Sequence, residues 1–214
     1  MTRGEMHEMF RRRIQDVAED LFLDSTVNRY LNAGLRYMQK EVLKLDPEAF
    51  FEVAQTDIVA NQGLYEKPTN MIHEIAFKIM GTGGRYIRLV RRPYFNTISR
   101  NSEAGAIYCH HGAFFLISPT PTSSVVDGIE LVHCPTLTMA DDSDVPPLNI
   151  NIHEGVVFSA EVFARGENGE GKSVFETKAK EDLALVVNNL PLYYKRSAAD
   201  VQQIEMDSSM EKDY

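Results

Sequence analysis

Cysteine is scarce in this chain, and long apolar runs are missing. Two cysteines, Cys109 and Cys134, among 214 residues are too few for a disulfide framework. The first residues lead into a charged segment without the apolar core of a signal peptide, so we expect synthesis in a reducing cytoplasm. No run of 18 apolar residues occurs, and the sequence therefore predicts no membrane-spanning helix.

Positive charge is also in short supply. The chain has 22 Lys and Arg against 31 Asp and Glu, which gives a net charge of −9. Proteins that read nucleic-acid sequence need a basic footprint, so this balance argues against that class. An acidic surface instead suits a protein past which DNA slides without sticking.

The clearest helical period lies in residues 24–42. Apolar residues recur there at steps of three and four, as expected for one buried face: Val27, Tyr30, Leu31, Leu35, Met38 and Val42. Burying each is worth roughly 1.5–3 kcal/mol, which outweighs the cost of about 1 kcal/mol for Gly34 inside a helix. Gly34 therefore indicates a place where another backbone comes close. Pro47 ends this helix.

An earlier amphipathic helix is predicted from Met6 to Leu23. It carries three consecutive arginines, Arg11, Arg12 and Arg13, partly on its outer face. A charge run on such a helix is most often a solvated face, and we interpret it so. Contact with phosphates or with an acidic partner is the alternative.

The hydrophobic period changes from 3.6 to 2 between Phe50 and Cys134. Strands are expected at residues 51–55, 75–79, 85–90, 106–110, 113–118 and 129–134. The glycine cluster of residues 81–84 joins two of them and predicts a hairpin loop. We expect an antiparallel module of five or six strands, inserted between helices.

Helical spacing returns at residues 152–164 and 175–190, after an acidic and proline-broken link at residues 139–151. Residues 197–214 are polar and acidic, which predicts a flexible tail that orders on a partner. The predicted fold class is α+β: a helical bundle of two N-terminal and two C-terminal helices, an inserted antiparallel β module and a flexible C-terminal tail. The predicted boundaries are 1–49, 50–138, 139–196 and 197–214.

One stretch matches the Walker A phosphate-binding pattern. It begins at Gly166 and ends at Ser173, with Lys172 in the lysine position. A working P-loop needs a buried strand before it and a sheet of βαβ units to supply a magnesium-binding aspartate, and the sequence predicts neither. A flexible loop between two helices is the preferred interpretation, with a P-loop nucleotide-binding protein kept as an alternative.

Cysteine and histidine, the usual zinc ligands, cluster in the β module. They are Cys109, His110, His111, His133 and Cys134. Neighbours on a strand point to opposite faces and no C-x-x-C pair is present, so a zinc-dependent β-domain binding module is only an alternative. No hydrolase elbow occurs either. We predict no enzyme, no catalytic or metal site and no cofactor.

The order of the parts resembles a known family. The phrase D-S-T-V-N-R-Y-L-N-A-G-L-R-Y at residues 24–37 is similar to the opening of tailed-bacteriophage head-to-tail adaptor proteins, which commonly read D-x-x-I-x-x-x-L-N-x-A. The β module with residues 117–121 and 129–137 is also similar, as is the acidic link at residues 141–146 before a helix. The resemblance covers roughly residues 16–195.

This resemblance implies a structural virion protein of the neck, the connector or head-completion position, made in the host cytoplasm. Copies would assemble as a homo-oligomeric ring, commonly a dodecamer, that joins the portal protein to tail, nozzle or second adaptor proteins. The ring would extend the channel for DNA ejection, with no sequence recognition of the DNA and no membrane.

Two sets of contact residues are predicted on this basis. The polar face of the helix at residues 24–42 is the candidate subunit contact: Asn28, Arg29, Asn32 and Arg36. The end of the chain is the candidate portal-docking segment: Tyr193, Tyr194, Val201, Ile204, Met206, Met210 and Tyr214.

Overall fold

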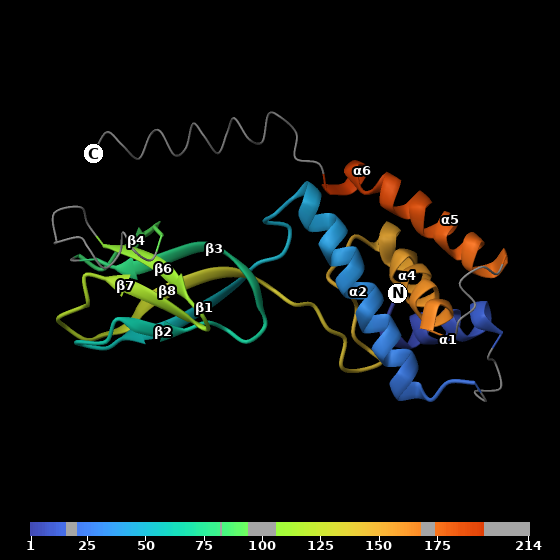
Figure 1. Ribbon diagram of the computed structural model, residues 1–214, viewed down its shortest axis with the longest axis horizontal. Coiled ribbons are helices and arrows are strands. Elements are labelled where there is room, and N and C mark those ends of the chain that lie inside the picture. The colour runs from blue at the N-terminus through green and yellow to red at the C-terminus, as the bar shows by residue number, and fades with distance from the viewer. Residues whose placement is uncertain (16–20, 82, 94–105, 168–173, 195–214) are drawn as a thin grey trace. The chain divides into compact units, whose positions relative to one another are not determined.

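The computed structural model describes residues 1–15, 21–81, 83–93, 106–167 and 174–194 (Figure 1). The chain divides into two compact units. The helical unit combines Met1–Ala49 with Leu137–Tyr214, and the β unit is Phe50–Thr136. The mixed α+β class predicted from the sequence is confirmed.

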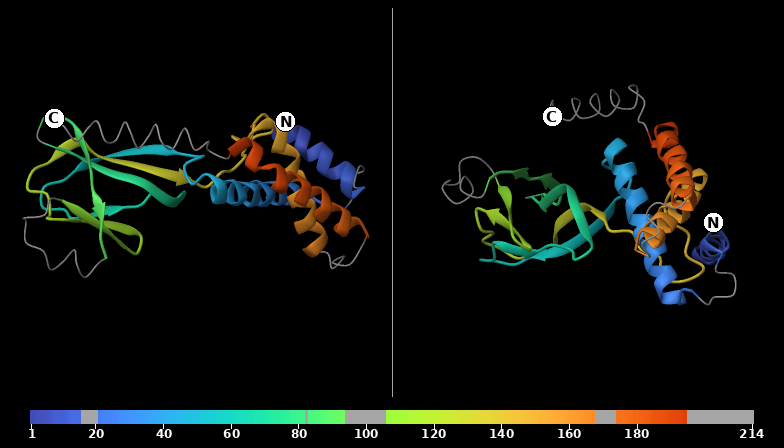
Figure 2. Two further views of the ribbon diagram at one scale, coloured as in Figure 1. Left: turned by 90° about the horizontal axis from the view of Figure 1, so that it is seen from above. Right: turned by 45° about the vertical axis from the view of Figure 1, so that its right-hand side comes forward.

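The helical unit is built around α4. Its elements are α1 (Arg3–Ile14), α2 (Asp24–Leu45), the short 3-10 helix η1 (Ile150–Ile152), α4 (His153–Glu167), α5 (Val174–Asn189) and α6 (Pro191–Tyr194). Helix α4 packs against α1, α2 and α5, which are drawn in dark blue, light blue and red-orange in Figure 2. It is therefore buried along most of its length.

Helix α1 is shorter than the sequence predicted. A capping box formed by Thr2 and Glu5 begins it, and Gln15 ends it with a φ of 62°. The expected continuation to Leu23 is wrong, because a left-handed residue stops the helical path at this point. Leu21 and Leu23 lie outside the helix and are exposed.

Helix α2 agrees with its predicted pattern. All six residues of its apolar face are buried, and its backbone comes close to α4 at Gly34. A Cβ on Gly34 would collide with the carbonyl oxygen of Val156 and would lie 2.9 Å from the Ser159 hydroxyl oxygen. The close approach predicted from Gly34 is confirmed.

The β unit consists of two four-stranded sheets with the orders β1-β8-β3-β4 and β2-β7-β6-β5. The strands are β1 (Glu52–Ile58), β2 (Leu64–Glu66), β3 (Met71–Met80), β4 (Tyr86–Arg88), β5 (Val90–Arg91), β6 (Ile107–His111), β7 (Phe114–Ser118) and β8 (Val125–Pro135). All pairs are antiparallel except β5 with β6, which is parallel. The predicted count of five or six strands is too low, because β2 and β5 are too short to show alternation.

The core of the β unit lies between the two sheets. Phe77 stacks on Tyr108 and tilts against Phe115, each with a ring-centroid distance of 4.9 Å. Leu89, the single residue between β4 and β5, is also buried in this core. The chain therefore crosses from one sheet to the other at Leu89.

The hairpin predicted at residues 81–84 joins β3 to β4, with Met80 opposite Tyr86. No helix among the described residues has both the length and the apolar character needed to cross a membrane.

Candidate interaction surfaces

The candidate subunit-contact residues of α2 differ in how they are used within the helical unit. The side chain of Asn32 donates to the carbonyl oxygens of Asn28 and Met139, both at 3.1 Å, and accepts from the Met139 N–H at 2.7 Å. These bonds fasten the segment that enters the helical unit after β8. Asn32 is thus an internal clamp, and only part of its surface is available to a neighbour.

Arg29 is also engaged inside the unit. Its guanidinium donates to Glu167 at 2.8 Å, and the Tyr30 hydroxyl donates to the same carboxylate oxygen at 2.7 Å. Burial and the bond to Glu167 raise the pKa of Tyr30, so its hydroxyl keeps its proton. The pair Arg29–Glu167 joins α2 to the last turn of α4.

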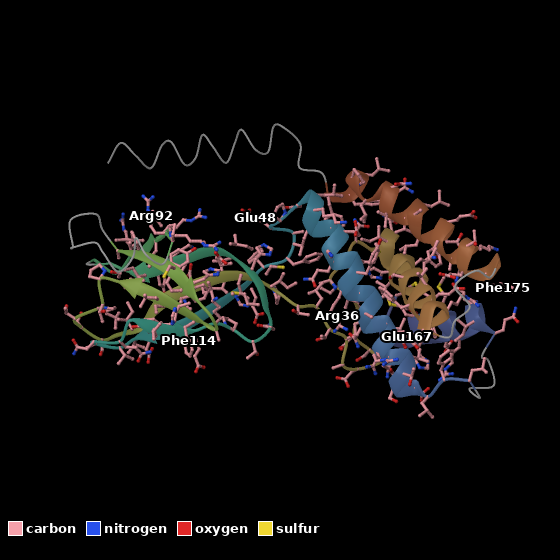
Figure 3. The ribbon with its side chains drawn as sticks, viewed as in Figure 1. Arg36, Glu48, Arg92, Phe114, Glu167 and Phe175 are labelled. Atoms are coloured by element: carbon pink, nitrogen blue, oxygen red, sulfur yellow. The ribbon has the colours of Figure 1, made fainter. Side chains whose placement is uncertain are left out.

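Arg36 is exposed and has no hydrogen bond or ion pair with any described residue (Figure 3). Asn28 is half-buried, and its side-chain oxygen has no hydrogen-bond partner among the described residues. Of the four predicted contacts, Arg36 is therefore the one whose charge is fully available to another molecule.

The arginine run on α1 is mostly not a solvated face. Arg11 is buried and donates to Asp24 at 2.6 Å and to the carbonyl oxygen of Phe22 at 2.9 Å. Only Arg12 is largely exposed, with Glu8 as its partner at 3.1 Å. The predicted solvated face is wrong for Arg11, because its guanidinium ties α1 to the start of α2.

Arg13 belongs to a network of four charges that joins three helices. It donates to Glu161 on α4 at 2.6 Å and to Asp182 on α5 at 2.7 Å. Arg165 donates to the other Glu161 oxygen at 2.9 Å and to the backbone oxygen of Arg13 at 3.1 Å. Although burial lowers the pKa of Arg13, its two carboxylate partners outweigh that effect and raise it.

The candidate portal-docking residues lie at the end of the described chain. Tyr193 is partly exposed, whereas the Tyr194 hydroxyl accepts the Asn149 N–H at 2.8 Å. Burial raises the pKa of Tyr194. The remaining five residues fall outside the described residues: Val201, Ile204, Met206, Met210 and Tyr214.

An apolar groove of about 360 Å³ runs between α2, α4 and α5. Tyr37 and Phe163 form one wall, with their rings 6.2 Å apart, and Leu183 and Val187 form the other. The apolar lining makes this groove suited to protein contact.

The Walker A match lacks the context of a P-loop. Gly166 and Glu167 are the last residues of α4, where a P-loop requires the end of a strand. The rest of the match, residues 168–173, lies outside the described residues. The neighbouring elements are helices and not βαβ units, so the pattern alone carries no nucleotide site.

The candidate zinc ligands are divided between the two sheets. Cys109 and His110 lie on β6, whereas His133 and Cys134 lie on β8. Both cysteines are buried, and His110 faces Glu74 with 2.9 Å between Nε2 and the carboxylate oxygen. In the part of the chain that the structure describes, no three potential ligands are close enough to hold a metal ion.

Two sides of the β unit differ in charge, which was not anticipated from the sequence. On one side β4, β5 and the residues next to them carry Arg85, Arg88, Arg91 and Arg92, all exposed, and we call this the basic edge. Arg92 points away from the strands in Figure 3. The sequence signal is four arginines and no acidic residue in positions 85–92 of an acidic chain.

On the other side, β1 and β2 border a cleft of about 760 Å³. Asp57, Glu66 and Asp127 are exposed at its lining, and we call it the acidic cleft. Core residues form its apolar floor: Phe77, Phe115, Ile129 and Leu131. The period-two pattern gives no sign of this cleft, because it depends on how two sheets meet.

Comparison with protein families identifies the group to which the sequence belongs. The family model described as SU10 adaptor protein matches residues 1–201. The chain belongs to the SU10 adaptor protein family. This is a phage head-to-tail adaptor family, so the family predicted from the sequence is confirmed. A search of curated proteins found no match.

Membership in the SU10 adaptor family assigns a structural role in the phage particle. The match includes the helical unit, the whole β unit and the start of the C-terminal tail. Both units therefore belong to the adaptor itself.

Proposed function

We propose that this chain is a neck protein whose copies assemble as a ring, commonly twelve-fold, beneath the portal. The ring joins the portal to tail, nozzle or second adaptor proteins and extends the channel through which DNA leaves the head. The observation that carries the proposal is the family match over residues 1–201. The net charge of −9 supports it, because DNA passes an acidic surface without binding to it.

The helical unit supplies surfaces that fit this role. Arg36 offers a charge on α2 that no described residue pairs with, and the groove bordered by Phe163 and Leu183 offers apolar area. Leu192 and Tyr193 on α6 are also exposed. In this proposal the helical unit forms the ring body, and the tail beyond Arg196 docks on the portal.

The decisive experiment mixes the purified chain with portal rings and images the product by electron microscopy. We expect a second ring attached coaxially to the portal. A chain that stays monomeric and joins neither portal nor tail preparations would contradict the proposal.

Deletion of residues 197–214 tests the role of the tail. We expect an unchanged melting temperature, because the described core residues lie before Lys195, together with weaker capture by the portal. The matched control is the full chain with scrambled residues 197–214, which keeps composition and charge. Equal portal capture by all three proteins would contradict docking by the tail.

A further inference from the structure

Among the described residues, no strand pairs with the outer side of either edge of the β unit. The edge strands are β1 and β4 in one sheet and β2 and β5 in the other. Figure 1 shows β4 and β2 on different sides of the strand layers. Edge strands present unpaired N–H and C=O groups along their outer side, so each is a site at which another chain can dock.

The charges of the two edges are opposite. Arg85 and Arg92 have no acidic partner among the described residues, and Arg91 remains 60% exposed although it contacts Glu74 at 3.1 Å. Glu66, at the other edge, is likewise exposed and without a partner in the described parts of the chain. The basic edge therefore has an excess of positive charge that the described residues of the β unit do not neutralise.

The acidic cleft has a net negative charge, because Asp57, Glu66 and Asp127 outnumber the one lysine in its lining, Lys67. The Lys67 ammonium donates to the carbonyl oxygen of Gly112 at 2.6 Å and lies 5.3 Å from the Phe115 ring centre. Asp57 accepts the Asp127 N–H at 2.9 Å through one carboxylate oxygen and stays exposed.

Apolar side chains accompany the charges on both edges. On the basic edge Ile87 and Val90 are 57% and 54% exposed. At the acidic cleft Val59 is 44% exposed, and Leu64 on the bordering strand β2 is 42% exposed. A phosphate backbone complements arginine but not Ile87 and Val90, so these features favour a protein partner over DNA.

We propose that the basic edge of one copy docks in the acidic cleft of the next copy. This contact joins two different surfaces of identical chains, which is the heterologous arrangement that closes into a ring when the rotation permits. The inference rests on the ring proposed above and names the β-unit surfaces that join its neighbours. Because it depends on charge, the contact weakens as salt concentration rises.

A charge exchange between two variants tests this contact. The first variant, Arg85→Glu with Arg92→Glu, cancels the net positive charge of the basic edge, because only Arg88 and Arg91 remain there. The second, Asp57→Asn with Glu66→Lys, makes both edges basic or neutral, and the amide oxygen introduced by Asp57→Asn can still accept the Asp127 N–H. Each variant alone should self-associate about tenfold less than the wild type in sedimentation velocity, because the net attraction between the edge and the cleft is then lost.

Mixing the two variants in equal amounts should restore assembly, with the variants alternating around the ring. Native mass spectrometry distinguishes this mixed product by mass. The matched control, Arg85→Lys with Arg92→Lys, keeps the charge and should assemble as the wild type does. Melting curves confirm that each variant is folded.

Three results would overturn the inference. They are normal assembly of either charge-reversed variant, failure of the mixture to assemble, and absence of any self-association of the wild type with or without portal. Binding of a short DNA duplex that is lost in the first variant while assembly is unchanged would assign the basic edge to DNA instead. Portal capture is measured separately from self-assembly. If the portal does not capture the protein while the variants assemble as expected, the adaptor function is contradicted. If the portal captures the protein while the variants do not behave as expected, only this contact is contradicted.

Discussion

Gly34 shows how one small residue fixes the distance between two helices. The missing side chain lets α2 approach the Val156 carbonyl and lets the Ser159 hydroxyl reach the Gly34 carbonyl at 3.3 Å. The sequence indicated that a backbone comes close here, because a glycine interrupts an otherwise apolar helix face. Its partner on α4, more than a hundred positions away, has no such signal.

Replacing Gly34 with alanine should therefore destabilise the protein by about 1–3 kcal/mol, since the added methyl group forces the two backbones apart. Gly166→Ala is the matched control, because it adds a Cβ to a helical glycine with open space around it. That control should be neutral or stabilising by up to about 1 kcal/mol. Urea denaturation compares them, and equal losses would contradict the close-packing explanation.

Two histidines, the half-buried His110 and the buried His153, make stability depend on pH. Burial lowers the pKa of His110, although Glu74 opposes this, and burial lowers the pKa of His153, whose Nε2 lies 2.9 Å from the Leu148 carbonyl oxygen. Both therefore stay neutral in the fold at a pH where the unfolded chain, with a pKa of about 6.5, takes up protons. Stability is fully present above that pH and is lost as pH falls below it.

We expect the melting temperature to decrease between about pH 7.5 and 5.5. The variants His110→Gln and His153→Gln should each flatten this dependence, even if they lower the melting temperature itself. A slope that the double variant leaves unchanged would assign the effect to other groups.

At the scale of elements, the helical unit depends on polar contacts as well as apolar faces. Helical periods predicted α2, α4 and α5 because apolar residues repeat within each of them. The network of Arg13, Glu161 and Asp182 was not predictable, because its members lie on three helices and no local pattern relates them. The i, i+4 pair Glu161–Arg165 is the only part of it with a sequence signal.

Glu161→Ala should cost about 3–5 kcal/mol, because it leaves two arginines without their shared carboxylate. Exposed Glu181→Ala is the control on the adjacent helix and should change stability by less than about 0.5 kcal/mol. Chemical denaturation measures both. A loss for Glu161→Ala no greater than that of the control would show that the network contributes little.

We expect the polar face of α2 to contain residues needed for the fold and a residue needed for assembly. Asn32→Ala should lower stability by about 1–3 kcal/mol, because the buried Met139 N–H loses its partner. Arg36→Ala should leave stability unchanged within about 0.5 kcal/mol and weaken ring assembly. Melting curves and sedimentation velocity distinguish the two, and normal assembly of Arg36→Ala would remove that residue from the subunit contact.

At the scale of the whole molecule, the alternation of Phe77 and Ile79 predicted strands, and the glycines after Met80 predicted their hairpin. Pairing between strands far apart in sequence left no local trace, so neither the two sheets nor the acidic cleft was predictable. The positive charge around Arg85 and Arg92 could be predicted from the sequence. Its position on the edge opposite Glu66 could not be predicted, because that position follows from the strand orders of both sheets.

The β unit is expected to fold without the rest of the chain. Its first strand pairs with its last, with Glu52 opposite His133, so both ends of the fragment are held in one sheet. Residues 50–136 expressed alone should give a cooperative thermal transition and a β-type circular dichroism spectrum. Residues 50–118, which lack β8, are the control and should not fold. A non-cooperative transition for the longer fragment would show that it depends on the helical unit.

The packing of α2 against α4 also sets an order of events during synthesis. Val156 is translated more than a hundred residues after Gly34, and at about 5–20 residues per second this takes on the order of 10 s. During that interval the β unit can complete its sheets, while Leu31, Leu35 and Met38 on α2 still await the helix that covers them. The nascent chain thus carries an uncovered apolar helix until α4 is made, and we expect chaperones that bind such surfaces to bind it during that interval.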